Sequence, residues 1–200
     1  MNAAQSKFLV SLALVTGLSG AANASIFLPP GTGPTPLPGA TAAAEPDLAG
    51  VVLHDVLLPF HINNAGGALL FDGQLQNRVV KSTRTGRLHF YYAIRNTRPG
   101  LNGIVRALYT KSFAATPQAF ADFRPDGLGT VKPVSAARNA GGGETIQFAF
   151  VPSATRLVGG LESRFFFVKT SAFNFVGGGL TYIQLTTGES VAVNTVVPTP

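Results

Sequence analysis

Bulky apolar residues alternate with polar ones along much of the chain, which is the period-two pattern of half-buried β-strands. In TIQFAFV, Ile146, Phe148 and Phe150 share one face and Gln147 lies opposite. The segment RFFFVKT divides in the same way, with Phe165 and Phe167 on one face and Arg164, Phe166 and Val168 on the other. No window shows a sustained helical stripe, so the pattern predicts strands with these phenylalanines in the core.

Turn residues join several of these segments into hairpins. Gln74–Ser82 and Arg87–Arg95 flank the tetrad Thr83-Arg84-Thr85-Gly86, and a four-residue loop with glycine at its end suits a hairpin. Leu180–Thr186 and Ser190–Val197 flank Thr187-Gly188-Glu189 in the same manner. About eight to ten strands with turn signals between most of them predict an all-β fold, an antiparallel β-sandwich of jelly-roll-like type.

The predicted sandwich is a single domain over residues 50–197, and residues 198–200 form a tail. Residues 25–49 are rich in proline, glycine and alanine. Proline lacks the backbone N–H that helices and sheet ladders use, so this segment is expected to be an extended arm or linker outside regular pairing.

Residues 1–24 have the order of a secretory signal peptide. Lys7 precedes an apolar run from Phe8 to Leu18, and Ala22-Asn23-Ala24 places small residues where a signal peptidase cuts. The run is too short to span a bilayer, which needs roughly 20 apolar residues. We therefore expect cleavage after Ala24 and a secreted protein (extracellular, periplasmic or associated with the cell envelope) whose mature chain has no membrane span.

Composition narrows the chemistry. The chain has no cysteine, so disulfides, cysteine metal ligands and cysteine nucleophiles are excluded and the core must stabilise the secreted fold alone. The formal net charge of +6 becomes +5 when Lys7 leaves with the signal peptide. A basic exported protein suits anionic polymers or an anionic envelope surface, although the charge also serves solubility.

The stretch RLHFYYAIRN carries the candidate binding surface. Period-two spacing places Leu88, Phe90, Tyr92 and Ile94 on a core face, and it places Arg87, His89, Tyr91, Ala93 and Arg95 on a face expected to meet solvent. Eight basic residues between Arg78 and Lys111 have no acidic residue among them. The candidate contact residues for a polyanion are Arg78, Lys81, Arg84, Arg87, His89, Tyr91 and Arg95. The alternative is that these charges only protect a hairpin edge from aggregation.

The sequence assigns no catalytic residues, no metal site and no cofactor. The three histidines match no zinc-ligand spacing, and there is no G-x-S-x-G motif around a serine nucleophile. The nine acidic residues are scattered, so nothing in their spacing indicates the carboxylate pair of a glycosidase. Whether the protein is an enzyme stays open, and a non-enzymatic role is favoured.

The succession LLFDGQLQNRVV, TGRLHFYYAIRN, TIQFAFV and RFFFVKTSAFNF resembles exported bacterial β-domains found in proteins of the PEP-CTERM type, over about residues 66–186. The chain stops at VVPTP, without the tripeptide, apolar helix and basic tail of that sorting signal, so membrane sorting is not expected. The resemblance implies an extracellular or envelope location and implies no catalytic residues.

These observations together predict a secreted, non-enzymatic envelope or extracellular-matrix protein that binds or assembles, with polyanions as candidate ligands. Two alternatives remain. One is a secreted hydrolase acting on polysaccharide or lipid. The other is a self-assembling subunit in which the 25–49 arm or the VVPTP tail adds a strand to a neighbour's sheet.

Overall fold

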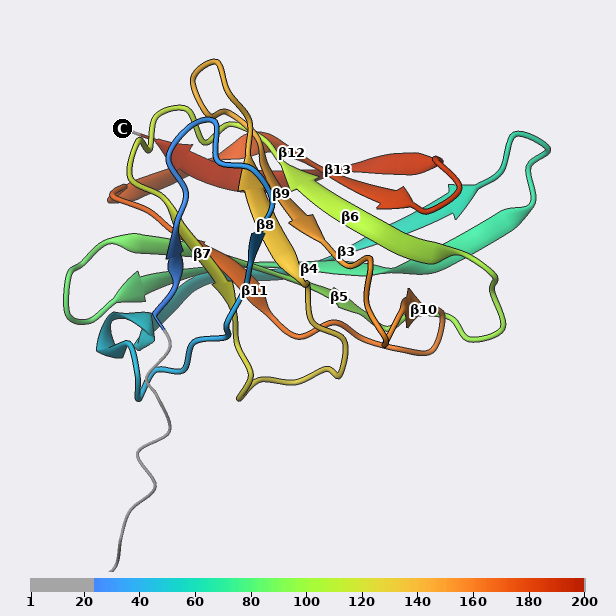
Figure 1. Ribbon diagram of the computed structural model, residues 1–200, viewed down its shortest axis with the longest axis horizontal. Helices are drawn as coiled ribbons and strands as arrows, with labels where there is room; N and C mark the ends of the chain where they lie inside the picture. The colour runs from blue at the N-terminus through green and yellow to red at the C-terminus, as the bar shows by residue number, and fades with distance from the viewer. Residues whose placement is uncertain (1–23, 200) are drawn as a thin grey trace, which may run out of the picture.

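The computed structural model describes residues 24–199, which form two antiparallel β-sheets packed face to face (Figure 1). The all-β sandwich expected from the sequence is therefore confirmed. The predicted signal peptide, apart from Ala24, lies outside the described residues. Within residues 24–199 no helix is long and apolar enough to cross a membrane.

The first sheet has six strands and carries the residues of greatest interest here. Its order across the sheet is β1 (Ile26–Phe27), β7 (Phe120–Phe123), β11 (Phe166–Lys169), β5 (Leu88–Arg95), β4 (Leu69–Ser82) and β3 (Gly50–Asn63). The predicted hairpin is confirmed as β4–β5, in which Gln74 lies opposite Arg95 and Lys81 lies opposite Leu88. Pro59 falls in β3, an edge strand, where a missing N–H is tolerated.

The second sheet has seven strands. Six follow the order β13 (Ser190–Thr199), β12 (Asn174–Leu185), β6 (Ile104–Thr110), β9 (Ile146–Ala149), β8 (Ser135–Arg138) and β2 (Thr35–Pro36), while β10 (Leu157–Val158) also pairs with β6. The second predicted hairpin is confirmed as β12–β13. The strand β13 extends to Thr199, so most of the expected tail is paired, with Pro198 opposite Phe175.

The main core lies between the sheets. Phe148 and Phe150 point into it from the second sheet and Phe90 and Phe166 from the first, and all four are fully buried. The ring of Phe166 lies 4.8 Å from that of Phe148, measured between centroids. The period-two assignment of these side chains to the core is confirmed, because each inward position on a strand has a partner on the facing sheet.

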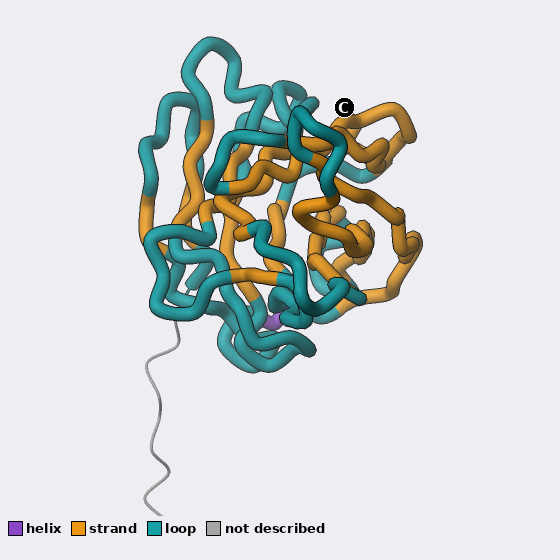
Figure 2. Tube along the Cα trace, turned by 90° about the vertical axis from the view of Figure 1, so that its right-hand side faces the viewer, coloured by secondary structure: helices purple, strands orange, loops and turns teal. Residues whose placement is uncertain are grey.

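Residues 25–49 do not stay outside the sheets. They supply β1 to the first sheet and β2 to the second, followed by the short 3-10 helix η1 (Pro46–Leu48). The expectation that prolines prevent pairing fails here because each pairing is only two residues long and lies at a sheet edge. Strands fill the middle of the molecule, and η1 lies among loops at one end (Figure 2).

The arm is held by specific contacts with the first sheet. The backbone N–H of Gly39 donates a hydrogen bond to a carboxylate oxygen of Asp122 on β7, at 2.8 Å. Gly39 has a φ of +92°, and a Cβ there would lie 2.8 Å from the ring of Phe123. Only glycine therefore lets the arm approach this strand so closely.

Candidate binding surface around the β4–β5 hairpin

The structure divides the seven predicted contact residues into two groups. Lys81, Arg84 and Arg87 are exposed at the turn between β4 and β5, and Arg78 is half-buried on β4. His89, Tyr91 and Arg95 lie on β5 and are only 2%, 4% and 5% exposed. The prediction that these three β5 residues meet solvent is wrong.

The outer face of β5 is covered because β5 is a central strand with apolar material on both sides. Phe165 and Phe167 lie beside Tyr91, with ring centroids 6.1 and 5.2 Å away. From the arm, Ala40 and Leu48 join the same apolar cluster. The outer face of this sheet thus has a second, smaller core beneath the arm.

A pocket of about 490 Å³ opens on this outer face. Its lining includes Arg78, Tyr91 and Phe165 on the sheet, Leu48 from η1, and Arg124 and Leu128 from the loop after β7. We call it the outer pocket. No pattern in the sequence pointed to Arg124 or Leu128, because both reach the pocket from a loop distant along the chain.

Each arginine at or beside the outer pocket has its own carboxylate. Arg78 bonds to Asp55 at 2.6 Å, and Arg124 bonds to both oxygens of Asp126 at 2.8 Å. The Arg95 guanidinium is 3.3 Å from Glu162 and donates to the Ser163 carbonyl at 2.9 Å. These pairs leave the pocket with little excess positive charge.

The carboxyl groups of Asp55 and Asp126 are poor proton donors. Burial alone would raise the pKa of Asp55, but the hydrogen bond and charge of Arg78 lower it below its ordinary value. The Arg124 hydrogen bonds likewise lower the pKa of Asp126. A glycosidase acid requires the opposite shift, so this geometry suits ion pairing.

Aromatic and polar groups form the floor of the outer pocket. The guanidinium carbons of Arg78 and Arg95 lie 4.6 and 4.7 Å from the centre of the Phe165 ring, within cation–π range. The Tyr91 hydroxyl and the Arg78 Nε–H are buried and have no hydrogen-bond partner among the residues that the structure describes. Burial raises the pKa of Tyr91 to about 12, so the hydroxyl keeps its proton at neutral pH.

The remaining predicted residues form a different surface, which we call the cationic turn: Lys81, Arg84, Arg87 and Phe173. Among residues 24–199 none of its three cations makes an ion pair. Phe173 is 60% exposed, and the Arg87 guanidinium lies 6.0 Å from its ring centre. Phe173 is not among the residues predicted from the sequence, although an isolated phenylalanine between Ala172 and Asn174 was a usable signal.

The backbone of the cationic turn is well fixed. The Ser82 N–H donates to the Arg87 carbonyl and the Gly86 N–H donates to the Ser82 carbonyl, both at 2.9 Å. The Ser82 hydroxyl accepts from the N–H groups of Arg84 and Thr85 at 3.3 Å. Gly86 has a φ of +71°, which closes the turn before β5 begins.

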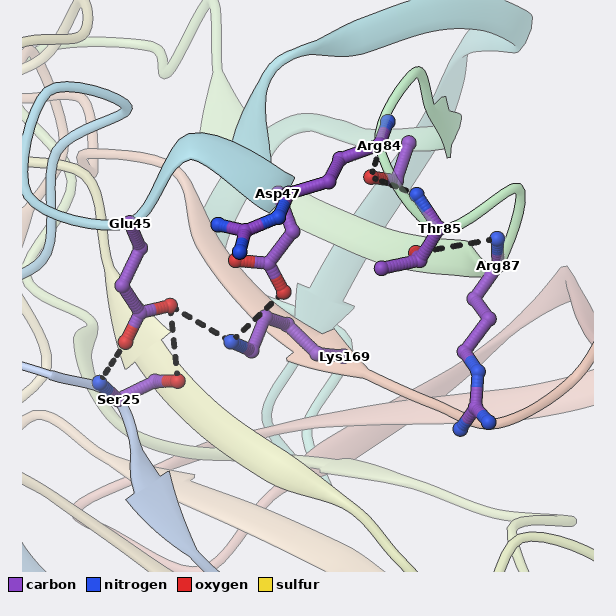
Figure 3. A network of polar contacts seen from close by, with 8 residues as sticks. Ser25, Glu45, Asp47, Arg84, Thr85, Arg87 and Lys169 are labelled. Carbon is purple, nitrogen blue, oxygen red and sulfur yellow. Dashed lines mark hydrogen bonds and ion pairs between the residues drawn. The ribbon is translucent and has the colours of Figure 1, made fainter.

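A charged network lies next to the cationic turn (Figure 3). The Lys169 ammonium bonds to Glu45 at 2.7 Å and to Asp47 at 3.2 Å. Asp47 and Lys169 also line a pocket of about 350 Å³ together with Arg87 and His89. The predicted residues His89 and Tyr91 therefore belong to two different pockets, each bordered by a residue of η1.

Groups of three or more histidine or acidic side chains able to hold a metal ion are absent from residues 24–199. Burial lowers the pKa of His89 to about 4, and its Nδ1 atom has no hydrogen-bond partner.

The fold and surface define a disulfide-free, all-β sandwich with an aromatic, cationic turn at one hairpin. Comparison with known proteins adds no family to this description: no family model, no curated protein and no solved structure matches the chain.

Proposed function

We propose that this protein is a secreted, non-catalytic binding protein of the cell envelope or extracellular matrix, and that its cationic turn contacts acidic polysaccharide. The observation that carries the proposal is the group of three exposed cations that have no carboxylate partner within residues 24–199, placed beside an exposed phenylalanine. The outer pocket offers no such group of unpaired cations among the described residues, because its arginines already form ion pairs with carboxylates.

Acidic polysaccharide is the ligand class that uses both parts of the surface. Carboxylate or sulfate groups along such a polymer pair with Lys81, Arg84 and Arg87, and the apolar face of a sugar ring packs on Phe173. A fixed turn reduces the conformational entropy lost on binding. The expected export of the chain places it where such polymers occur.

The self-assembly alternative needs an unpaired segment to donate as a strand, and within the described residues both proposed segments are already paired. The arm already pairs through β1 and β2, and the VVPTP segment already pairs through β13. Strand addition by either segment would require an internal ladder to open first.

The test compares two variants of equal charge. Lys81→Gln/Arg84→Gln/Arg87→Gln removes the cations of the turn. The control, Arg98→Gln/Arg106→Gln/Arg156→Gln, removes three exposed cations from other loops and strands. Binding of the exported protein to polygalacturonate is measured by calorimetry at several salt concentrations, with dextran as the neutral polymer.

We expect at least a tenfold loss of affinity in the turn variant and less than a twofold loss in the control. The slope of log affinity against log salt, about −2 to −3 for three contacts, should approach zero only in the turn variant. Equal losses in both variants would contradict a specific site. Phe173→Ala should weaken binding to polygalacturonate, which has sugar rings, and should leave binding to polyphosphate, which has none, unchanged. If the unchanged protein binds DNA more tightly than polygalacturonate, nucleic acid would replace acidic polysaccharide as the ligand class.

A further inference from the structure

The backbone nitrogen of Ser25 lies at an unusual position in the fold. It donates a hydrogen bond to one carboxylate oxygen of Glu45, and the Ser25 hydroxyl donates to the other oxygen at 3.1 Å. Figure 3 shows the contact between Ser25 and Glu45. The two residues are 8% and 9% exposed, so the contact is largely shielded from water. Ser25 is also the residue that follows the signal-peptidase site expected from the sequence.

The charges around Glu45 are unbalanced without a further cation. Glu45 and Asp47 share a single ammonium group, that of Lys169. Burial keeps the pKa of neighbouring His89 at about 4, so this histidine is neutral at pH 7. Asp122 lies near enough that the negative charge of Glu45 contributes to raising the pKa of the Asp122 carboxyl. Arg87 lines the pocket that Asp47, His89 and Lys169 also line, but it makes no ion pair with either Glu45 or Asp47 within the described chain.

We propose that the Ala24–Ser25 bond is the processing site and that the new α-ammonium group of Ser25 is the missing cation, locked against Glu45. A signal peptidase adds water across this amide bond: hydroxide joins the Ala24 carbonyl carbon, and the Ser25 nitrogen takes a proton. At neutral pH the freed amine takes a second proton and becomes an ammonium group. Glu45 and Asp47 then face two cations, Lys169 and the chain terminus.

Processing in this scheme changes the energetics of the fold. A neutral amide N–H gives Glu45 one ordinary hydrogen bond, whereas an ammonium group gives a charge-assisted bond, which is about twice as strong. A buried carboxylate is costly unless it is paired. Because Glu45 precedes η1 and Asp47 lies within it, the new ion pair also fixes the arm segment that covers the outer face of β5. Because Ser25 is largely buried in the folded chain, this scheme has cleavage occurring before the arm docks.

The first test determines the N-terminus of the exported chain by intact mass. A mature protein that begins at Ser25 supports the proposal, and one that begins at any other residue overturns it.

The second test measures how fast the α-amine of that mature protein reacts with an acylating reagent at pH 7, in the folded state and in urea. We expect acylation at least ten times slower in the folded state, and equal rates would refute the buried ion pair.

Variants separate this ion pair from general burial. Glu45→Gln keeps the shape of the side chain but removes its charge, and should restore at least half of the lost acylation rate. The matched control Glu189→Gln changes a half-buried carboxylate in the β12–β13 turn, away from Ser25, and should leave protection intact. If Glu45→Gln does not fold, Ser25→Ala, which keeps the amine and removes only the 3.1 Å hydroxyl bond, should retain protection. Loss of protection in Glu189→Gln or in Ser25→Ala would overturn the assignment.

Discussion

Arg138 provides the sharpest test of how the arm is joined to the sandwich. It is 2% exposed and makes no ion pair within residues 24–199. Instead, its guanidinium group donates to five backbone carbonyl oxygens at 2.8–3.3 Å, those of Leu28, Phe113, Thr116, Pro117 and Gly143. One side chain therefore connects the arm, the loop before β7 and the loop before β9.

The variant Arg138→Met keeps much of the apolar stem and removes every donor. Each buried acceptor that loses its partner costs about 1–3 kcal/mol. The cost is reduced because the desolvation of the guanidinium group is also removed and because water can enter at the edge. We expect a net loss of about 4–6 kcal/mol, which is a large part of the stability of a typical domain.

The measurement is urea unfolding followed by circular dichroism, since the chain has no tryptophan. Arg156→Met is the control, because Arg156 is exposed, and it should change the free energy of unfolding by less than about 0.5 kcal/mol. Hydrogen exchange should also show faster exchange in residues 26–40 of Arg138→Met than in the rest of the sheet. A loss below about 1.5 kcal/mol with an unchanged denaturant slope would refute the reasoning.

Three further predictions concern other buried groups. Burial lowers the pKa of His89 to about 4 from 6.5, so on acidification the unfolded chain binds the proton first and the free energy of unfolding should fall between about pH 6.5 and pH 4. The variant His89→Gln should remove up to about 3 kcal/mol of that fall. Parallel curves of unfolding free energy against pH for the variant and the unchanged protein would contradict this prediction. Burial raises the pKa of Asp122 to about 6, so its stabilisation is complete below about pH 3.8 and is lost as pH rises through 6. Asp122→Asn, which keeps an acceptor for Gly39, should therefore stabilise the protein by about 2 kcal/mol at pH 8 and by little at pH 4, whereas a uniform effect would count against this assignment. Phe166→Ala should cost about 3–5 kcal/mol in urea unfolding, because Phe166 is fully buried among aromatic rings of both sheets; a cost below 2 kcal/mol would show that the core can collapse around the cavity.

The candidate site was only partly accessible from the sequence. Lys81, Arg84 and Arg87 were correctly expected to be exposed, because a short hairpin turn of polar residues leaves them no place in a core. His89, Tyr91 and Arg95 were predicted to be exposed to solvent, but all three are buried. The unbroken apolar and aromatic run from Phe90 to Ile94 was the available warning, since such runs are typical of strands buried on both faces.

The sequence alone determined the longer strands, the two hairpins and the inward phenylalanines of the main core, but not the short strands of residues 25–49. These features depend on the alternation of apolar and polar residues and on turn residues within about ten positions, and they do not depend on which segment packs across the sheet. The period-two pattern separates the two faces of a strand, but it cannot decide whether the second face is exposed to solvent.

Only the tertiary structure decided that question, because it depends on contacts between segments far apart in the chain. The outer face of β5 is buried by Leu48 from the arm and by Phe165 and Phe167 from the segment at β11. The same long-range packing brings Ser25, Glu45 and Lys169 together, although they are up to 144 positions apart in the numbering. Burial and charge pairing of this kind are properties of the assembled chain, so no local pattern in the sequence carries them.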